Sequence, residues 1–385
     1  MEEPLKHWAL REIKMKKFAS LIILVSFSVI AEPLITELSP IVVKDTTANK
    51  PQSKTWKHAG SHYAIFPDKE GTFVFKLKCR TWVKQLMISR LKKGKADVFS
   101  SENRVFVLLV NGTKNNEVII LESDGSEYSI LSRRALALGK SVETATIALD
   151  SAKRLWIVYD SIHTIEVIHS EAPYAQFYAP LMLANNITRD DISVITAIPA
   201  RRSIGVFWSS QRTKVFAFRE HFDEDAADIW QEDERPAYSQ ARRSGRGFAD
   251  DHMNVAVASD GTLYTSVKTS YDKKGYTTIG MLVRRANGVW DQEIYGVSTA
   301  SGSKPMIILN EKENFVEVVY DSSGSSSAST LYKRASLDNL VFPLIPGNYL
   351  YKKGFMPTSS KDTSEGDYVI MVTKGKFINS VLVEW

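Results

Sequence analysis

Short apolar stretches recur through most of the chain and are separated by residues that favour turns. Examples are Val105–Val110, Trp156–Tyr159, Ile204–Trp208 and Phe315–Tyr320. Asp-Gly, Asn-Gly, Ser-Gly and Lys-Gly pairs stand between such stretches, and no long run shows the helical period of about 3.6 residues. This pattern predicts an all-β domain with room for roughly twenty or more short strands.

A repeating unit organises these strands. A polar or charged residue, a short apolar strand, a turn and a second apolar strand return together. The units begin near Lys54, Asp97, Glu143, Asp191, His252, Lys304 and Met356. Their separations of 43, 46, 48, 61, 52 and 52 residues are typical of the four-stranded blade of a β-propeller, which buries its faces by stacking on its neighbours in a ring. Seven starts predict a seven-bladed propeller, and six blades are the alternative.

The repeat also sets the expected domain boundaries. We expect a single propeller domain over 51–385. The last unit lacks sequence for a fourth strand, so the N-terminal segment 32–50, around Leu38–Val43, is a candidate to close the ring. The acidic segment Glu220–Glu234 is interpreted as an insertion between the fourth and fifth blades, because it accounts for the longest step in the repeat.

Residues 1–31 have the pattern of a secretory signal peptide. Lys14, Lys16 and Lys17 precede a mostly apolar stretch over 18–31, and a polar segment follows it. The apolar stretch is too short to span a bilayer. We therefore expect cleavage after Ala31, export to the periplasm or the cell exterior, and no stable membrane span afterwards. Met15 is a second possible start of the same signal.

The composition narrows the choice of binding partners and cofactors. Lys and Arg total 49 and Asp and Glu total 44, a net charge of +5, and no basic run lies beside aromatic residues, so nucleic acid is a poor candidate. Cys79 is the only cysteine, so neither an intramolecular disulfide nor a cysteine-based metal site can form. We expect a monomer without a metal or other cofactor. Ca²⁺ stays open, because no motif in the sequence decides it.

Charged residues open one blade after another. In a propeller the first strand of each blade lines the channel, and its start meets the end of the second strand on the same rim. By this geometry the following residues converge on one mouth: Lys54, Asp97, Glu143, Asp190, Asp191, Asp251, His252, Lys268 and Lys304. An all-β core would favour apolar residues at such places, so a solvated funnel for a polar ligand is indicated. The alternative is that these charges only tie neighbouring blades together.

Asp251, His252 and Asp191 are the candidates for catalysis. A histidine beside a carboxylate can serve as a general base or proton shuttle, although an aspartate in this position can also simply cap a turn. Glycoside hydrolysis requires two carboxylates about 5 Å apart for retention or about 6.5–9.5 Å apart for inversion.

The remaining residues of the mouth are candidates for ligand binding: Lys54, Asp97, Glu143, Asp190, Lys268 and Lys304. The three lysines could neutralise a substrate carboxylate or sulfate, as a polysaccharide lyase requires.

Six segments carry a resemblance to known proteins: Gln52–Trp56, Lys95–Val98, Asp190–Ser193, Ala249–Asn254, Val267–Ser270 and Leu331–Lys333. Together they resemble exported bacterial sialidase-like (BNR-repeat-like) β-propeller proteins of poorly defined function. The resemblance runs in order over nearly the whole mature chain. It implies a propeller of the sialidase type, often associated with polysaccharide-directed modules, and it implies no reaction.

The chain departs from that pattern in two ways. Lys304-Pro305 stands where an Arg-Pro pair would be expected, and the Phe/Tyr-Arg-Ile-Pro motif of true sialidases is missing. Classical sialidase activity is therefore not expected. The sequence predicts a propeller that binds a poly- or oligosaccharide in its funnel, with polysaccharide lyase and glycoside hydrolase as candidate activities. The alternative is a non-catalytic glycan-binding or surface scaffold protein.

Overall fold

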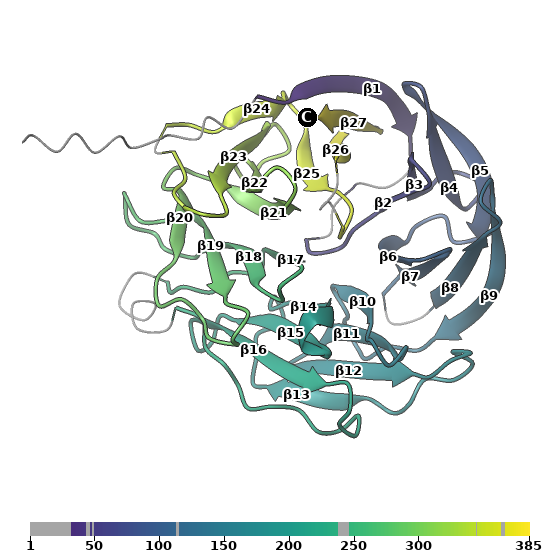
Figure 1. The fold of residues 1–385 in the computed structure, drawn as a ribbon, viewed down its shortest axis with the longest axis horizontal. Helices are drawn as coiled ribbons and strands as arrows, with labels where there is room; N and C mark the ends of the chain where they lie inside the picture. Colours follow the sequence, from purple (N-terminus) through teal and green to yellow (C-terminus); the bar gives the residue numbers. More distant parts are fainter. Residues whose placement is uncertain are drawn as a thin grey trace, which may run out of the picture. The chain divides into compact units, whose positions relative to one another are not determined.

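The computed structural model describes residues 32–43, 47, 50–112, 115–237, 246–343, 345–362 and 366–385. These residues form seven antiparallel sheets that follow one another around a ring (Figure 1). The fold is therefore the seven-bladed β-propeller that the repeat predicted. The expected signal peptide, 1–31, lies outside the described residues.

The first four sheets contain the strands of the N-terminal half. The first consists of β2 (Thr55–His58), β3 (Ser61–Pro67), β4 (Thr72–Lys78) and β5 (Thr81–Ser89). The second consists of β6 (Lys95–Ser101), β7 (Arg104–Val110), β8 (Asn116–Ser123) and β9 (Tyr128–Leu136). The third consists of β10 (Ala145–Leu149), β11 (Leu155–Ser161), β12 (Thr164–Ser170) and β13 (Leu181–Asn185). The fourth consists of β14 (Ser193–Ile198), β15 (Ser203–Ser210) and β16 (Val215–Phe222).

The remaining three sheets complete the ring. The fifth consists of β17 (Met253–Val257), β18 (Leu263–Lys268), β19 (Ile279–Arg284) and β20 (Tyr295–Ser298). The sixth consists of β21 (Ser303–Asn310), β22 (Phe315–Asp321), β23 (Thr330–Ser336) and β24 (Asn348–Tyr351). The seventh consists of β25 (Phe355–Thr358), β26 (Tyr368–Lys374), β27 (Phe377–Glu384) and β1 (Leu34–Val42).

Each expected blade start lies within two residues of the start of a first strand. The agreement follows from turn chemistry, which fixes where strands can pair. In the fifth sheet, for example, Gly261 adopts a φ of +91° between β17 and β18, a conformation that glycine adopts without steric cost. The side chain of Asp260 accepts a hydrogen bond from the Thr262 amide at 2.8 Å and stabilises the same turn.

The N-terminal strand β1 is the outermost strand of the seventh sheet, where it pairs with β27 near the C-terminus. Leu38 and Ile41 on β1 are buried and belong to a cluster with Phe73 and Trp82 of the first sheet. Both ends of the described chain thus contribute to one sheet, so the ring is joined by hydrogen bonds and by packing against the first sheet.

The fourth sheet has three named strands, and the acidic insertion takes the place of the fourth. The Glu234 amide donates to the Phe218 carbonyl at 2.8 Å, and the Gln231 amide donates to the Glu220 carbonyl at 2.8 Å. These bonds pair the insertion with the outer edge of β16. Trp230 within it packs edge-on against Trp156 of the third sheet, with ring centroids 5.7 Å apart.

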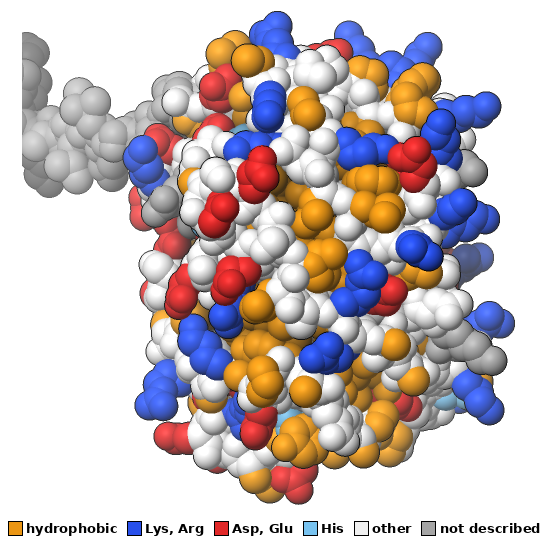
Figure 2. All heavy atoms as spheres, turned by 90° about the vertical axis from the view of Figure 1, so that its right-hand side faces the viewer, with side chains coloured by type: hydrophobic (Ala, Val, Ile, Leu, Met, Phe, Trp, Pro, Cys, Tyr) orange, Lys and Arg blue, Asp and Glu red, His pale blue; other side chains and the backbone are white. Residues whose placement is uncertain are grey.

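The hydrophobic core lies between adjacent sheets, as stacked blades require. Six clusters of buried apolar residues each link neighbouring sheets. The outer strands are half solvated: Figure 2 shows the side with the outer strands of the first two sheets, where apolar side chains stand among Lys and Arg. Within the described ranges the only helical turn is η1 (Pro199–Arg201), and no helix is long and apolar enough to cross a membrane.

Candidate ligand-binding site

The first strands line the central channel and all run in the same direction along it. We call the end where they begin the proximal mouth and the end where they finish the distal mouth. Pairing of Ala145 with Tyr159, and of Met253 with Val267, confirms that second strands end where first strands begin. Side chains from both places can therefore meet at the proximal mouth.

Asp251 is the centre of a charged cluster at this mouth. One of its oxygens accepts a short ion-paired hydrogen bond from Lys50, and the other lies 2.7 Å from His252 Nδ1. Lys50 also donates to Glu143 at 2.6 Å. The cluster therefore connects the segment before β2, the start of the third sheet and the start of the fifth.

His252 lies between two carboxylates. Its Nδ1 is 2.9 Å from Asp250 as well as 2.7 Å from Asp251. Burial disfavours the charged imidazole, but the hydrogen bonds and charges of both aspartates outweigh burial and raise the pKa of His252 above its usual value. A protonated imidazole donates hydrogen bonds from both nitrogens. In this state His252 would act as a general acid or as a charged hydrogen-bond donor, and not as a base.

The same interactions act in the opposite direction on Asp251. Burial opposes its ionisation, but the hydrogen bond and charge of His252, together with Asp250 and Lys50, hold the pKa of Asp251 well below its usual value. Asp251 is thus a fixed anion at neutral pH.

Three carboxylates converge beside Lys50. One oxygen from each of Glu143, Asp190 and Asp251 lies within 4.8 Å of the others. Asp190 is exposed, and desolvation together with the charge of Asp251 raises its pKa. Two neighbouring carboxylates whose pKa values are pushed apart are the arrangement in which one can act as an acid while the other stays ionised.

Lys268 and Ser270 extend the cluster along the fifth sheet. Lys268, at the end of β18, donates to Asp250 at 2.9 Å, and the Ser270 hydroxyl donates to the same oxygen at 3.0 Å. The Lys268 side chain is 28% exposed. It is therefore within reach of a ligand while its charge is balanced by Asp250.

Lys304 lies 4.0 Å from Asp321, the last residue of β22. Asp321 is fully buried and accepts the Met356 amide at 2.8 Å. Burial raises the pKa of Asp321 to about 7, against the effects of that amide and of Lys304. The bond from Met356 links the sixth and seventh sheets, and the charge of His252 also acts on Asp321.

Three of the predicted site residues are buried between blades. Lys54 is 2% exposed and donates to the Ala96 carbonyl at 3.3 Å. Asp97 and Asp191 are both 0% exposed. This burial keeps all three from touching a ligand at the mouth.

The two buried aspartates accept hydrogen bonds from backbone amides. Asp97 accepts the Ser53 and Ile147 amides, each at 2.8 Å. Asp191 accepts the Gln211 amide at 2.9 Å and the Thr188 amide at 2.7 Å. Both carboxylates therefore hold backbone segments together. This agrees with the alternative that such charges only link neighbouring blades.

Lys50 was not among the residues that the sequence singled out. It lies in the segment before the first blade, with a φ of 52°, and no local motif marks it. Its role depends on contacts with Glu143 and Asp251, which are 93 and 201 residues away. Only the closed ring brings these three together.

Two carboxylate-rich sets at this mouth have the donors of a cation site: Asp250, Asp251 and His252, and Glu143, Asp190 and Asp251. Their oxygens suit a hard cation such as Ca²⁺. However, the ammonium of Lys50 already lies against Glu143 and Asp251, and Nδ1 of His252 lies against Asp250. These groups supply the positive charge, so we assign no metal to the cluster.

Comparisons with known proteins identify the fold. No protein-family model matches the chain, and no curated protein sequence matches it. Among solved structures, a chain of the mitotic checkpoint complex has a TM-score of 0.56 at 11% identity, covering 97% of this chain and 98% of its own. The polysaccharide lyase Uly1 has a TM-score of 0.52 at 8% identity, covering 87% and 90%. The α-L-arabinanase of Penicillium chrysogenum with arabinobiose has a TM-score of 0.50 at 10% identity, covering 80% and 99%. This chain is a β-propeller. At such identities the likeness shows the fold alone.

Proposed function

We propose that the proximal mouth of this propeller binds a poly- or oligosaccharide. The observation that carries the proposal is the continuous line of hydrogen-bonded groups from Glu143 through Lys50, Asp251 and His252 to Asp250. Within this line carboxylates alternate with cations, so donors and acceptors lie side by side. Sugar hydroxyls both donate and accept hydrogen bonds, and such a surface can satisfy both functions.

The paired charges favour a ligand of low net charge. Lys268 is bonded to Asp250, and Lys304 lies beside Asp321. Lys268 is therefore not set apart to neutralise a substrate carboxylate or sulfate, and Lys304 is balanced in part by Asp321, whose pKa of about 7 leaves it partly ionised at neutral pH. A neutral glycan therefore fits this mouth better than a uronate polymer, and the lyase candidate is the less favoured one.

The spacing of Asp190 and Asp251 favours hydrolysis as a second candidate function. One oxygen of each lies no more than 4.8 Å from one oxygen of the other, so the pair is close enough for the short separation of about 5 Å that retaining glycosidases use. Asp190, with its raised pKa, would protonate the leaving oxygen, and ionised Asp251 would attack or stabilise the anomeric carbon. The named lyase and arabinanase share this fold, which is consistent with either binding or turnover.

The binding proposal is tested with the chain from residue 32 onward and a panel of neutral, uronic-acid-containing and sulfated polysaccharides. We expect retention on a neutral polysaccharide column that Lys268→Met weakens roughly tenfold by loss of a charge-assisted hydrogen bond. Lys78→Met is the matched control, because Lys78 is exposed at the end of β4. Equal retention of both variants would contradict a site at the proximal mouth.

Turnover is followed by reducing ends and by ultraviolet absorbance on the same panel. Hydrolysis gives reducing ends without a new double bond, whereas a lyase gives both. We expect Asp190→Asn to lose reducing-end formation while keeping retention on the column, and the exposed Asp228→Asn to change neither. If the parent chain releases no product from a polymer that it binds, the non-catalytic alternative holds.

We also propose that the protein is exported and that its signal is removed after Ala31. The support is the basic residues and apolar stretch at the N-terminus. Sequencing the N-terminus of protein recovered from outside the cytoplasm should give Glu32 as the first residue. An intact N-terminus at Met1 or Met15 would contradict removal of the signal.

A further inference from the structure

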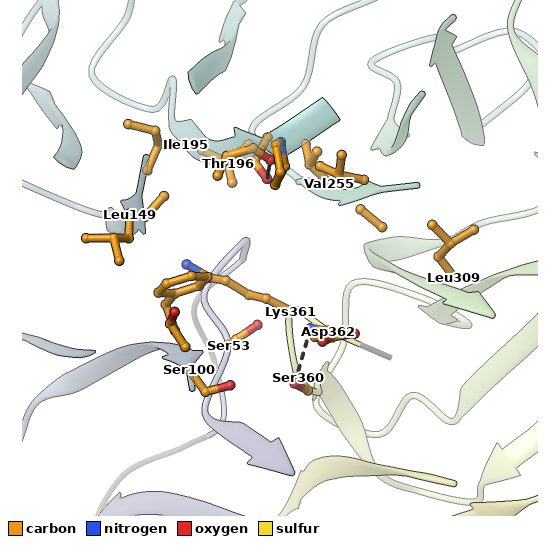
Figure 3. Close-up of a pocket in the computed structure, with 18 of the residues that line it drawn as sticks. Ser53, Ser100, Leu149, Ile195, Thr196, Val255, Leu309, Ser360, Lys361 and Asp362 are labelled. Carbon is orange, nitrogen blue, oxygen red and sulfur yellow. Dashed lines mark hydrogen bonds between the residues drawn. The ribbon is translucent and has the colours of Figure 1, made fainter. Parts of the chain in front are cut away.

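A cavity of about 490 Å³ runs along the channel between the proximal cluster and the distal mouth. First strands of six sheets line it, and the segment Ser360–Asp362 after β25 completes the ring. Leu149, Ile195, Val255 and Leu309 point into it from separate strands (Figure 3). These four side chains give the wall an aliphatic band beside polar lining residues such as Ser53, Ser100 and Thr196. The volume lies within the roughly 300–1,000 Å³ typical of ligand pockets.

The segment before β2 closes this cavity on the proximal side. Pro51 and Ser53 belong to the lining. Asn254 of the fifth sheet donates to the Pro51 carbonyl at 3.3 Å, and Thr358 of the seventh donates to the Gln52 carbonyl at 3.0 Å. The side chain of Gln52 donates to the Ala145 carbonyl of the third sheet at 2.7 Å. Bonds to three sheets hold the segment across the channel.

Lys361 adds a further contact on the proximal side of the cavity, which we call its floor. Its ammonium donates to Asp97 and to the Ile147 carbonyl, each at 2.6 Å, so its side chain spans from the seventh sheet toward the second and third (Figure 3). On the distal side the lining ends in exposed residues, including Ser151, Lys153 and Ser259. The described segment before β2 thus stands between this pocket and the proximal mouth, and the lining reaches solvent at the distal mouth.

A second cavity of about 370 Å³ adjoins the first between the first and seventh sheets. The two share Thr55, Ser100, Ser360 and Asp362. Lining residues that belong to the second cavity alone include Lys57, His58, His62 and Asp367. The site therefore has an aliphatic compartment and a polar compartment in contact.

The charges of the polar compartment are paired with one another. Asp367 accepts a short ion-paired hydrogen bond from Lys57 and lies 2.8 Å from His62 Nε2. Burial lowers the pKa of His62 in spite of Asp367, so the imidazole is neutral at pH 7. Lys57 and Asp367 then balance each other, so these three residues offer donors and acceptors without a net charge among them.

We propose that the distal pocket binds a small amphipathic molecule with an aliphatic tail and an uncharged, hydroxyl-bearing head. The tail lies along the aliphatic wall inside the channel, where burial of methylenes is favourable. The head lies in the polar compartment, where Lys57, His62 and Asp367 hydrogen-bond its hydroxyls. A charged head would find no unpaired partner of opposite sign among these three residues.

The test uses n-octyl β-D-glucoside below its critical micelle concentration, with glucose as the matched head without a tail. Isothermal titration calorimetry on the whole chain should show saturable binding of the octyl glucoside and no binding of glucose at the same concentration. Equal binding of both compounds, or of neither, would overturn the proposal.

Two variants locate the bound molecule. Thr196→Trp on β14 fills the aliphatic compartment, and we expect it to weaken octyl glucoside binding by roughly tenfold or more. Lys57→Met changes only the polar compartment; its side chain is 35% exposed, so folding should be retained. We expect Lys57→Met to weaken the binding of octyl glucoside and to leave the binding of a fatty alcohol of equal length unchanged.

Lys268→Met at the proximal mouth is the control for location. It should not alter octyl glucoside binding, and a loss equal to that of Thr196→Trp would place the ligand at the other mouth and contradict the proposal. Unchanged binding in both Thr196→Trp and Lys57→Met would also contradict it. Circular dichroism and the melting temperature of each variant separate loss of the pocket from loss of the fold.

Discussion

Lys50 and Asp251 form an ion pair between parts of the chain that are 201 residues apart. Both side chains are only 13% exposed, and the pair lies where the segment before β2 crosses the channel. Burial alone would lower the pKa of Lys50, but the charges of Asp251 and Glu143 raise it. The ion pair therefore holds the segment before β2 in place. This segment contributes to the charged proximal mouth through Lys50 and to the lining of the distal pocket through Pro51 and Ser53.

Replacing Lys50 with methionine should destabilise the protein. The change leaves Asp251 and Glu143 without their shared cation, and breaking a largely buried pair costs about 2–4 kcal/mol. Urea unfolding followed by tryptophan fluorescence gives the free energy of unfolding. Lys153→Met is the control, because its ion pair with Glu102 is exposed at 3.5 Å and should contribute less than about 1 kcal/mol. A loss no larger than that of the control would show that the segment is held by its other bonds alone.

His252 should keep its proton to a higher pH than an ordinary histidine. Its pKa is raised because the two aspartates outweigh burial, so the stability it contributes is present below an unfolded pKa of about 6.5 and is lost as pH rises through the higher folded value. Nitrogen-15 NMR of the imidazole, followed against pH, should give a titration midpoint above about 6.5. Asp251→Asn should lower the titration midpoint. A neutral ring at pH 6 in the parent protein would contradict the assignment.

Asp321 should make stability fall with rising pH. Burial raises its pKa from an ordinary 3.8 to about 7. The unfolded chain therefore releases this proton first, and stability is lost between about pH 4 and pH 7. Asp321→Asn keeps an acceptor for the Met356 amide and removes the titration. Melting temperatures across this range should decline less steeply in the variant, and parallel curves for the two proteins would rule out this role.

Arg284 holds the insertion of the fourth sheet against the fifth. Its side chain is 2% exposed and donates to Glu234 at 2.7 Å and to Glu220 at 2.8 Å. Arg284→Met leaves Glu234 without its cation and Glu220 with Arg201 alone, and should cost about 3–5 kcal/mol in unfolding free energy. The adjacent Arg285 is the control. Its side chain is 43% exposed and pairs with Asp291, so Arg285→Met should cost less than about 1 kcal/mol, and similar losses would contradict the prediction.

Closure of the ring can be tested with two neighbouring residues on β1. Ile41 is 6% exposed and faces the core, whereas Val42 is 68% exposed. Ile41→Asp buries an unpaired carboxylate and should cost about 3–5 kcal/mol. Val42→Asp should change the free energy of unfolding by no more than about 0.5 kcal/mol. If Ile41→Asp melts like the parent, β1 does not contribute to closure in solution.

The sequence was sufficient to predict the architecture, because short-range sequence patterns specify the hairpins from which each blade is made. Turn pairs such as Asp260-Gly261 and alternating strands define each hairpin, and their regular return defines the blade. The fourth sheet shows the limit of this reasoning. Its outer edge is formed by the insertion around Glu234, whose position depends on Arg284 from the next blade.

The candidate site was predictable only in part. Asp251 and His252 meet, and Lys268 bonds the preceding Asp250, as the blade geometry predicted, because these residues lie at the start and end of paired strands within one sheet. Asp97 and Asp191 occupy equivalent places but turn into the protein, where backbone amides bind them. Sequence position fixes the rim to which a residue belongs. It does not fix whether the side chain faces the channel or the neighbouring blade.

The sequence by itself thus determined the all-β architecture and the blade repeat, since strand period and turn chemistry act over a few residues. Tertiary structure alone decided which charges are exposed, which are buried and where the channel is closed. Lys50 and Lys361 lie in segments without a strand pattern of their own, and each reaches its partners only after the ring has closed. The electrostatics of the proximal mouth and the shape of the distal pocket arise from such contacts, because charge interactions depend on distance and burial rather than on order along the chain.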